Sequence, residues 1–186
     1  MIEIQQPIQV VVAYDFSPSS EQALGRAVEV AARAPQHVLH IIAALDPHEH
    51  ATSDTAEQVH KEVIAHATAA FAGRPTAAEV QFYVHARIGN PATEILSLAA
   101  EVGADLIFIG SHGKTGIERL LLGSVSERVV REAGCAVMVA RPKTYPDVEL
   151  FRVTRYDHER APHREPHCYT YTNRQVILRP NDWPIS

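Results

Sequence analysis

The 186-residue sequence has little cysteine, few aromatic residues and no long apolar run. Its two cysteines, Cys135 and Cys168, are too few for a disulfide framework in a domain of this size. Because no stretch of about 18 consecutive apolar residues occurs, we expect no membrane-spanning helix. The N-terminus also lacks the basic start and the apolar core of a signal peptide. These absences favour a cytoplasmic protein that has no membrane partner.

Positive charge is scarce as well, which excludes one class of partner. The chain has 17 Lys and Arg against 22 Asp and Glu, and its net charge is −5. Proteins bind nucleic acids largely by neutralising phosphates with basic side chains, so we expect no nucleic-acid partner. The Gly-Lys-Ser/Thr end of a Walker A loop and the glycine spacing of a dinucleotide fingerprint are also missing. Any anion would therefore be bound mainly by backbone groups.

The first 140 residues alternate short apolar runs with longer segments of helical periodicity. Strands are expected at 8–14, 38–45, 79–87, 106–109 and 136–140. Helices are expected at 18–33, 55–72, 90–100 and 124–133, and Asn90 is expected to cap the third of them and Gly103 to close it. This alternation predicts an α/β fold: a five-stranded parallel sheet with right-handed crossovers and helices on both faces.

The composition changes after residue 140. The last 46 residues hold half of the 12 prolines and show little helical periodicity. We interpret 1–142 as the folded domain and 143–186 as an irregular Pro- and His-rich extension that is partly ordered on the core. The extension contains potential zinc ligands at His158, His163, His167 and Cys168. Their spacing matches no closed zinc site, so no metal site is predicted.

The most informative motif follows the strand expected at 106–109. This strand ends at Gly110, a second glycine stands at Gly113, and Gly123-Ser124 opens the next helix. Glycine lets the backbone approach a ligand closely, and a helix N-terminus offers free N–H groups and a positive dipole end to an anion. The motif therefore favours phosphate binding. The alternative is an ordinary strand–loop–helix connection in which the glycines only allow the chain to turn.

Serines accompany the glycines at the start of this helix. Ser124-x-x-Glu127 matches a capping box, in which each side chain bonds a backbone N–H of the first turn. The hydroxyl groups of Ser124 and Ser126 are suited to bond phosphate oxygens.

A second candidate, Asp15, follows the first strand. Ser17 and Pro18 come next and are typical of a helix start, as N-cap and first helical residue. Ligands of parallel α/β sheets bind beyond the carboxyl ends of the strands, where the strand order reverses. The two motifs are therefore expected to line one crevice.

The glycine motif, Gly110-x2-Gly113-x9-Gly123-Ser124, closely resembles that of the ATP-binding branch of the universal stress protein family. The resemblance covers about residues 7–142 and includes Val-Ala-Tyr-Asp-Phe-Ser after the first strand and Cys-Ala-Val-Met-Val-Ala-Arg-Pro at the end. It implies a Rossmann-like sheet of the adenine nucleotide alpha hydrolase type that holds ATP, with or without Mg²⁺, at the strand ends. It also implies a homodimer joined through the fifth strands.

The resemblance assigns roles to individual residues. It implies phosphate contacts for Gly110, Gly113, Gly123, Ser124 and, more weakly, Ser126. It places Asp15 at the ribose hydroxyls, and Ala13 and Ile41 against the adenine ring. The alternatives are that Asp15 only shapes a turn and that Ile41 is an ordinary core residue.

Two histidines call for a plainer interpretation. His40 lies in an apolar strand and is expected to be a hydrogen-bonded core residue. His112 stands between two of the motif glycines and is either a phosphate contact or a residue that fills the loop.

No catalytic machinery is recognisable near these motifs. Efficient turnover needs a nucleophile with its base, a set of metal ligands or a residue that activates water. We therefore expect an ATP-binding regulatory protein of the stress response with no dedicated catalytic site. One alternative is an enzyme: either a slow ATP hydrolase, or an adenylating or ATP-pyrophosphatase protein, whose Ser-Gly-Gly-x-Asp-Ser is here replaced by Asp-Phe-Ser-Pro-Ser. The other is a dimeric interaction module that binds no nucleotide.

Overall fold

The computed structural model describes residues 6–33, 36–49, 52–72, 80–113 and 122–141. The chain divides into two units, 1–143 and 144–186, and every described residue lies in the first. The predicted extension and its candidate zinc ligands lie outside the described residues. The domain boundary expected at residue 142 therefore stays a prediction.

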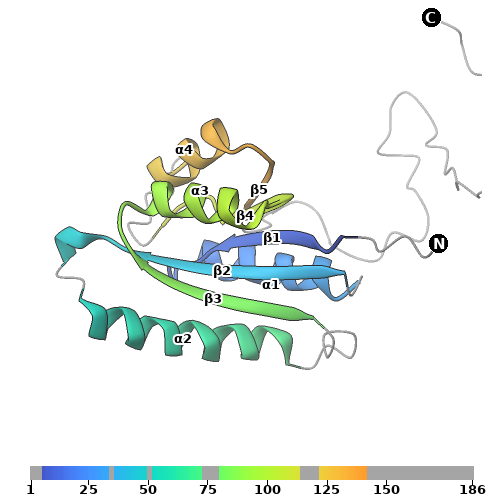
Figure 1. The fold of residues 1–186 in the computed structure, drawn as a ribbon, viewed down its shortest axis with the longest axis horizontal. Coiled ribbons are helices and arrows are strands. Elements are labelled where there is room, and N and C mark those ends of the chain that lie inside the picture. Colours follow the sequence, from blue (N-terminus) through green and yellow to red (C-terminus); the bar gives the residue numbers. More distant parts are fainter. Residues whose placement is uncertain (1–5, 34–35, 50–51, 73–79, 114–121, 142–186) are drawn as a thin grey trace, which may run out of the picture. The chain divides into compact units, whose positions relative to one another are not determined.

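Five parallel strands form one sheet (Figure 1). They are β1 (Ile8–Ala13), β2 (His37–Leu45), β3 (Gln81–Ile88), β4 (Leu106–Gly110) and β5 (Ala136–Ala140). Their order across the sheet is β3-β2-β1-β4-β5. The predicted fold class is confirmed, with strand ends displaced by at most two residues.

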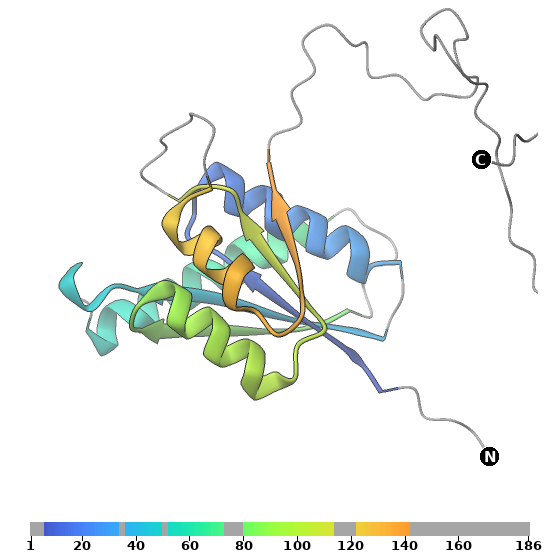
Figure 2. The same cartoon turned by 90° about the horizontal axis from the view of Figure 1, so that it is seen from above.

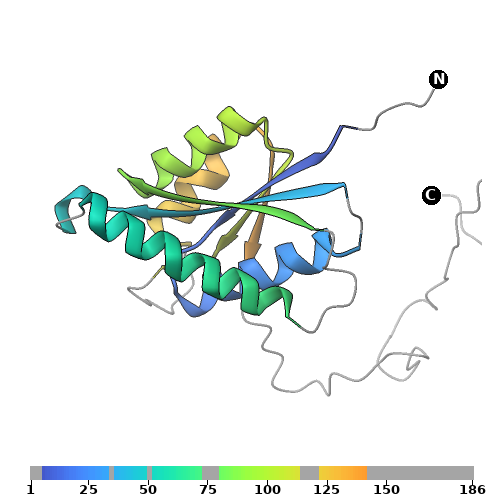
Figure 3. The ribbon, with the colours of Figure 1, turned by 60° about the horizontal axis from the view of Figure 1, so that its bottom comes forward.

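In the part of the chain that the structure describes, four helices cover the sheet, two on each face. They are α1 (Pro18–Ala31), α2 (Ser53–Phe71), α3 (Pro91–Val102) and α4 (Ser124–Glu132), and a short 3-10 helix, η1 (Pro47–Glu49), precedes α2. Helices α3 and α4 cover one face (Figure 1), and α1 and α2 cover the other, which comes forward in Figure 3. None of the helices in the described ranges is long and apolar enough to cross a membrane.

The two faces of the sheet give two apolar cores, and β1 contributes to both. Val10 and Val12 pack with α1 and α2, whereas Val11 and Ala13 pack with α3 and α4. A parallel strand that is buried on both faces reads as a continuous apolar run. The run Ile8–Ala13 therefore reveals a strand without revealing which residue faces which helix.

Local sequence signals start and end most of the helices. Ser17 caps α1 by accepting a hydrogen bond from the backbone N–H of Ser20 at 3.2 Å, and Pro18 follows it. Asn90 caps α3 in the same way, and Gly103 ends that helix with φ +63°. Both predicted starts and the predicted glycine stop are confirmed.

The strand order reverses between β1 and β4. The chain runs outward from β1 through β2 to β3, and then crosses to the other side of β1 to add β4 and β5 (Figure 2). The carboxyl ends of β1 and β4 therefore flank the point at which parallel α/β proteins bind ligands.

Candidate functional site

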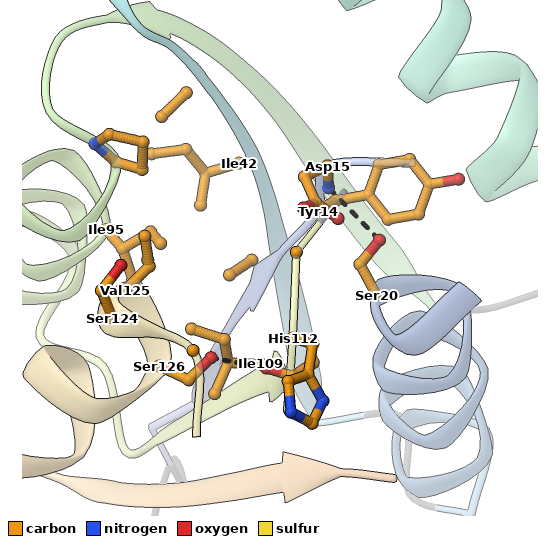
Figure 4. Close-up of a pocket in the computed structure, with 16 residues that line it drawn as sticks. Tyr14, Asp15, Ser20, Ile42, Ile95, Ile109, His112, Ser124, Val125 and Ser126 are labelled. Carbon is orange, nitrogen blue, oxygen red and sulfur yellow. Dashed lines mark hydrogen bonds between the residues drawn. The ribbon is translucent and has the colours of Figure 1, made fainter. Parts of the chain in front are cut away.

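A pocket of about 180 Å³ opens at this reversal point. The ends of β1, β2 and β4 and the first turns of α3 and α4 line it (Figure 4). The two motifs that the sequence places after separate strands, at Asp15 and at Gly110, thus meet in one crevice.

One side of the pocket holds the glycine motif. We call Gly110, Gly113, Gly123 and Ser124 the glycine cradle; all four line the pocket. The backbone N–H of Gly123 donates to the carbonyl oxygen of Ser111 at 2.9 Å, which brings the start of α4 against the end of β4. The cradle therefore assembles from segments that are about ten residues apart in the sequence.

Packing explains two of these glycines but not the third. A Cβ on Gly110 would lie 2.6 Å from Ser19 Oγ and 2.8 Å from backbone atoms of α1, and one on Gly113 would lie 2.9 Å from Asp15 Oδ2. A Cβ on Gly123 would make ordinary van der Waals contact, at 3.5 Å, with backbone atoms of the loop that follows β4. Packing against the described residues therefore does not require a glycine at this position.

The start of α4 differs from the prediction. Gly123, not Ser124, is the N-cap residue, with φ −62° and ψ 152°, and no side chain caps the helix. The predicted capping box is wrong because this extended backbone at Gly123 moves Ser124 into the first turn. Glu127 is instead 3.9 Å from Arg131 in an exposed ion pair. The first turn of α4 thus presents backbone N–H groups that no capping side chain occupies.

Ser126 lines the pocket but has a protein partner. Its side chain is 3% exposed, and its Oγ donates to the carbonyl oxygen of Gly110 at 2.7 Å. This bond fixes the first turn of α4 to the end of β4. Its phosphate contact stays a prediction.

Asp15 is held by the turn that follows β1. Its Oδ1 accepts from the backbone N–H of Ser17 at 3.0 Å, and its Oδ2 stands over Gly113. The next residue, Phe16, has φ +64°, which is uncommon for a residue with a bulky side chain. Such strain persists only where the surroundings enforce it, and it gathers at functional sites. The sequence contains no signal for it.

The side chains beside this turn form a network on the far face of the sheet. The Tyr14 hydroxyl donates to Glu21 and lies 2.8 Å from His66 Nδ1. The Phe16 ring packs edge-on against Tyr14 and His66, at centroid distances of 5.0 and 5.4 Å. Burial raises the pKa of Tyr14 well above its usual range, so the phenol stays protonated. In Figure 4 the Tyr14 ring points away from the pocket.

Another part of the pocket lining is apolar. We call it the apolar wall; it consists of Ala13, Ile42, Ala44, Pro91 and Ile95. In Figure 4 Ile42 and Ile95 stand across the pocket from Asp15. Ala13 lies in the pocket as predicted from the resemblance.

The placement of Ile41 in the pocket is a prediction that the structure corrects. Ile41 is 0% exposed and packs in the core formed with α1 and α2. Its neighbour Ile42 faces α3 and lines the pocket. Successive side chains of a strand point to opposite faces, so an error of one residue moves the side chain through the sheet.

His40 is the hydrogen-bonded core residue that was expected. It is 8% exposed, and its Nε2 lies 2.9 Å from Gln9 Oε1 while its Nδ1 lies 3.1 Å from Nε2 of His85. Burial lowers the pKa of both imidazoles, and for His85 the nearby His40 and Arg87 add to this effect. Sequence reasoning missed His85, whose strand alternates less cleanly.

His112 has one ring nitrogen satisfied. Its Nδ1 lies 2.9 Å from Ser111 Oγ, and its Nε2 is buried with no hydrogen-bond partner among the described residues. Its carbonyl oxygen accepts from Ser19 Oγ, which ties this loop to α1. These contacts agree with a residue that fills the loop, and the phosphate contact of His112 stays a prediction. Within the described ranges, no group of three or more His, Cys, Asp or Glu side chains is placed to hold a metal ion.

The strand order, the apolar wall and the glycine cradle define a parallel α/β protein with a ligand crevice at its topological switch point. The model of the Universal stress protein family matches residues 9–141, and the chain belongs to that family. The family that the glycine motif indicated is thereby confirmed.

Relatives at about one-third identity extend over most of the chain. A putative universal stress protein of Staphylococcus epidermidis is 33% identical over 148 residues, which cover 74% of this chain and 86% of the relative. The universal stress protein YxiE of Bacillus subtilis is 32% identical over 149 residues, covering 72% and 98%. A universal stress protein of Methanocaldococcus jannaschii is 55% identical over 53 residues, 28% of this chain, and this match spans only 31% of the relative.

Solved structures of the family share the fold. A universal stress protein in complex with cAMP is 30% identical with a TM-score of 0.55, covering 73% of this chain and 97% of that chain. One from Archaeoglobus fulgidus in complex with dAMP is 26% identical with a TM-score of 0.53, covering 74% and 99%.

Proposed function

We propose that this chain is a nucleotide-binding regulatory protein of the stress response, with ATP as its ligand. The observation that carries the proposal is the division of one pocket into an apolar wall and a glycine cradle. A nucleotide has the same two parts, a flat apolar base and a charged phosphate chain. The family members solved with cAMP and with dAMP, both adenine nucleotides, support adenine as the base.

The phosphates belong in the glycine cradle. The first turn of α4, which no side chain caps, offers backbone N–H groups to an anion. Ser124 is exposed in that first turn, where its hydroxyl adds a donor. The chain needs no basic side chain for this contact, which agrees with its net negative charge.

The adenine ring belongs against the apolar wall. Ala13 and Ile42 form the floor of this wall from adjacent strands, and Pro91 and Ile95 contribute from α3. Flat aromatic ligands gain most of their affinity from such apolar burial.

Asp15 belongs between the apolar wall and the glycine cradle. Its carboxylate accepts hydrogen bonds from ribose hydroxyls in the proposed pose. Asp15 is also the residue that would hold a Mg²⁺ ion bound with the nucleotide, since carboxylate oxygens are ligands that this ion prefers. Mg²⁺ would there offset the repulsion between the carboxylate and the triphosphate.

The proposal includes no dedicated catalytic site. The buried Tyr14 phenol is held protonated and is directed to the far face, so it offers no base to the pocket. Slow hydrolysis of a bound triphosphate would be a side reaction. The cytoplasmic location expected from the sequence stays part of the same proposal.

A homodimer through β5 completes the proposal. Strand β5 lies at an edge of the sheet, and Met138 is 43% exposed on it. An exposed apolar edge strand favours pairing with a second copy. We expect a dimer in sedimentation at micromolar concentration and a shift toward monomer in Met138→Asp; a wild-type monomer would contradict it.

The decisive experiment is mass spectrometry of the small molecules released by denaturing the purified full chain, followed by calorimetric titration with ATP, cAMP and GTP. The matched variants are Gly123→Ala, which adds a methyl group beside the cradle, and Gly25→Ala, where a Cβ meets open space in α1. We expect ATP to bind the wild type and Gly25→Ala alike and to bind Gly123→Ala at least tenfold more weakly.

Other results of the titrations would change the proposed ligand or reject nucleotide binding. Tighter binding of cAMP than of ATP would change the ligand but keep the site. Equal binding of GTP would remove adenine specificity. No released nucleotide and no measurable affinity would leave the interaction module that binds no nucleotide.

A further inference from the structure

One arginine connects the start of α3, which contributes to the apolar wall, with α4, whose start contributes to the glycine cradle. Arg128 of α4 donates through Nη1 to Asn90 Oδ1 at 3.1 Å and to Thr93 Oγ1 at 3.0 Å. Its Nε donates to Glu132 at 3.0 Å, which fixes the direction of the guanidinium along its own helix. The planar fork of arginine suits this simultaneous contact with several acceptors.

Both acceptors belong to the first turn of α3. Asn90 is the N-cap of that helix, and Oδ1 bonds the backbone N–H of Thr93 as well as Arg128. Pro91 and Ile95 of the same turns form part of the apolar wall. A shift of Asn90 therefore moves the wall.

The other end of the connection is the glycine cradle. The start of α4 is fixed to β4 by the bonds Gly123 N–H to Ser111 and Ser126 Oγ to Gly110. Figure 2 shows α3 and α4 side by side on one face of the sheet. Arg128 thus links the helix that supplies the cradle to the helix that supplies the wall.

We propose that Arg128 is a positioning residue that sets the spacing between the apolar wall and the glycine cradle. The inference rests on the proposed nucleotide site and deepens it. A nucleotide that contacts both the apolar wall and the glycine cradle is a bivalent ligand. Such a ligand gains affinity from its two linked parts only when the geometry permits both contacts at once. Removing the Arg128 side chain lowers the affinity for ATP, while the apolar wall keeps its affinity for adenosine and the glycine cradle keeps its affinity for phosphates.

The test uses the full chain and three probes: ATP, adenosine and inorganic tripolyphosphate. Adenosine reports on the apolar wall, tripolyphosphate on the glycine cradle, and ATP on both together. In Arg128→Met we expect the dissociation constant of ATP to rise about tenfold, as in other linked ligands that lose their geometry. The dissociation constants of adenosine and tripolyphosphate are expected to stay within about twofold. If Arg128 only stabilised the fold, its substitution would change the dissociation constants of the three probes by the same factor.

Arg131→Met is the matched control, because Arg131 lies on the same helix and pairs with Glu127 and Glu132 rather than with α3. We expect it to bind ATP like the wild type. Thr93→Val removes one acceptor and keeps the shape of the side chain, and we expect the same selective loss for ATP to a smaller extent. This variant decides the matter if Arg128→Met does not fold.

Two results would overturn the inference while leaving the proposed function intact. One is unchanged ATP affinity in both Arg128→Met and Thr93→Val. The other is an equal loss for ATP and adenosine, which would make Arg128 a support of the wall alone. A wild type that binds neither ATP nor its halves would overturn the proposed function together with this inference.

Discussion

At the scale of single residues, the glycines of one motif have different physical reasons. Gly110 and Gly113 lack a Cβ because Ser19 and Asp15 occupy that space. A Cβ on Gly123 would meet only ordinary van der Waals contacts, at 3.5 Å. The sequence motif treats the three alike, so only the structure separates the glycines that packing requires from the one that it does not.

This difference predicts unequal effects of an added methyl group on stability. We expect Gly110→Ala to lower the free energy of unfolding by about 2 kcal/mol, because the new Cβ would overlap backbone atoms of α1. Gly123→Ala should change it by less than about 0.5 kcal/mol. Urea denaturation without nucleotide measures both. Similar losses in the two variants would show that Gly123 is also required for packing.

Ile41 and Ile42 show what the sequence could not decide. The run His37–Leu45 predicts a buried strand, but both residues are apolar, and Ile41 packs on one face while Ile42 packs on the other. The alternation of a half-buried strand, which would have told the two apart, is missing from a strand covered on both sides. The prediction therefore found the strand and missed the pocket residue by one position.

The pair also gives a matched test of the apolar wall. Ile42→Val and Ile41→Val each remove one buried methylene, and both should cost about 1 kcal/mol of stability. Only Ile42→Val should weaken adenosine binding, by about fourfold, since a buried methylene contributes about 0.8 kcal/mol. Titration with adenosine checks this. An equal loss in Ile41→Val would mean that the base does not contact the wall.

At the scale of elements, local signals predicted three helix ends and failed at one. Ser17, Asn90 and Gly103 act on their own helices through their own side chain or backbone. At α4 the cap is decided by the extended backbone of Gly123, which the sequence pattern Ser124-x-x-Glu127 does not report. The left-handed turn at Phe16 is missed as well; the Phe16 ring packs edge-on against His66 of α2, a contact that the local sequence does not report.

The corrected capping predicts the effect of two substitutions. Asn90→Ala should lower the free energy of unfolding by about 1 kcal/mol or more, because it removes both the α3 cap and an acceptor of Arg128. Glu127→Ala should change it by less than about 0.5 kcal/mol, because an exposed ion pair contributes little. Thermal or urea unfolding checks both. A loss near 1 kcal/mol in Glu127→Ala would restore the capping box.

At the scale of the whole molecule, the alternation of strands and helices was enough to predict the sheet and the end of it at which the pocket lies. Connections between parallel strands are right-handed and strands are short, so the pattern allowed few arrangements. The contacts across the sheet were not predictable, because they join side chains from different strands. The clasp of Gln9, His40 and His85 is one such contact: it links β1, β2 and β3 on one face.

This clasp makes the stability of the domain depend on pH. Burial lowers the pKa of His40 and His85, so the folded chain holds both imidazoles neutral while the unfolded chain protonates them near pH 6.5. Below that pH the unfolded state binds more protons, and stability falls as the pH falls. Protonation of both imidazoles would also abolish the bond between them, because neither His40 Nδ1 nor His85 Nε2 could then accept. Among the charged groups that act on His85, Arg87 and His60 oppose its protonation and Glu101 favours it.

We therefore expect the urea midpoint of the wild type to be constant above about pH 7 and to decrease from pH 6.5 to 5. The double variant His40→Gln/His85→Gln should be less stable at pH 8 and show a flatter profile. His48→Gln, an exposed residue of η1, controls for the loss of an imidazole and should retain the wild-type slope. An equally steep decrease in the double variant would assign the acid sensitivity to other groups and leave the clasp a purely structural contact.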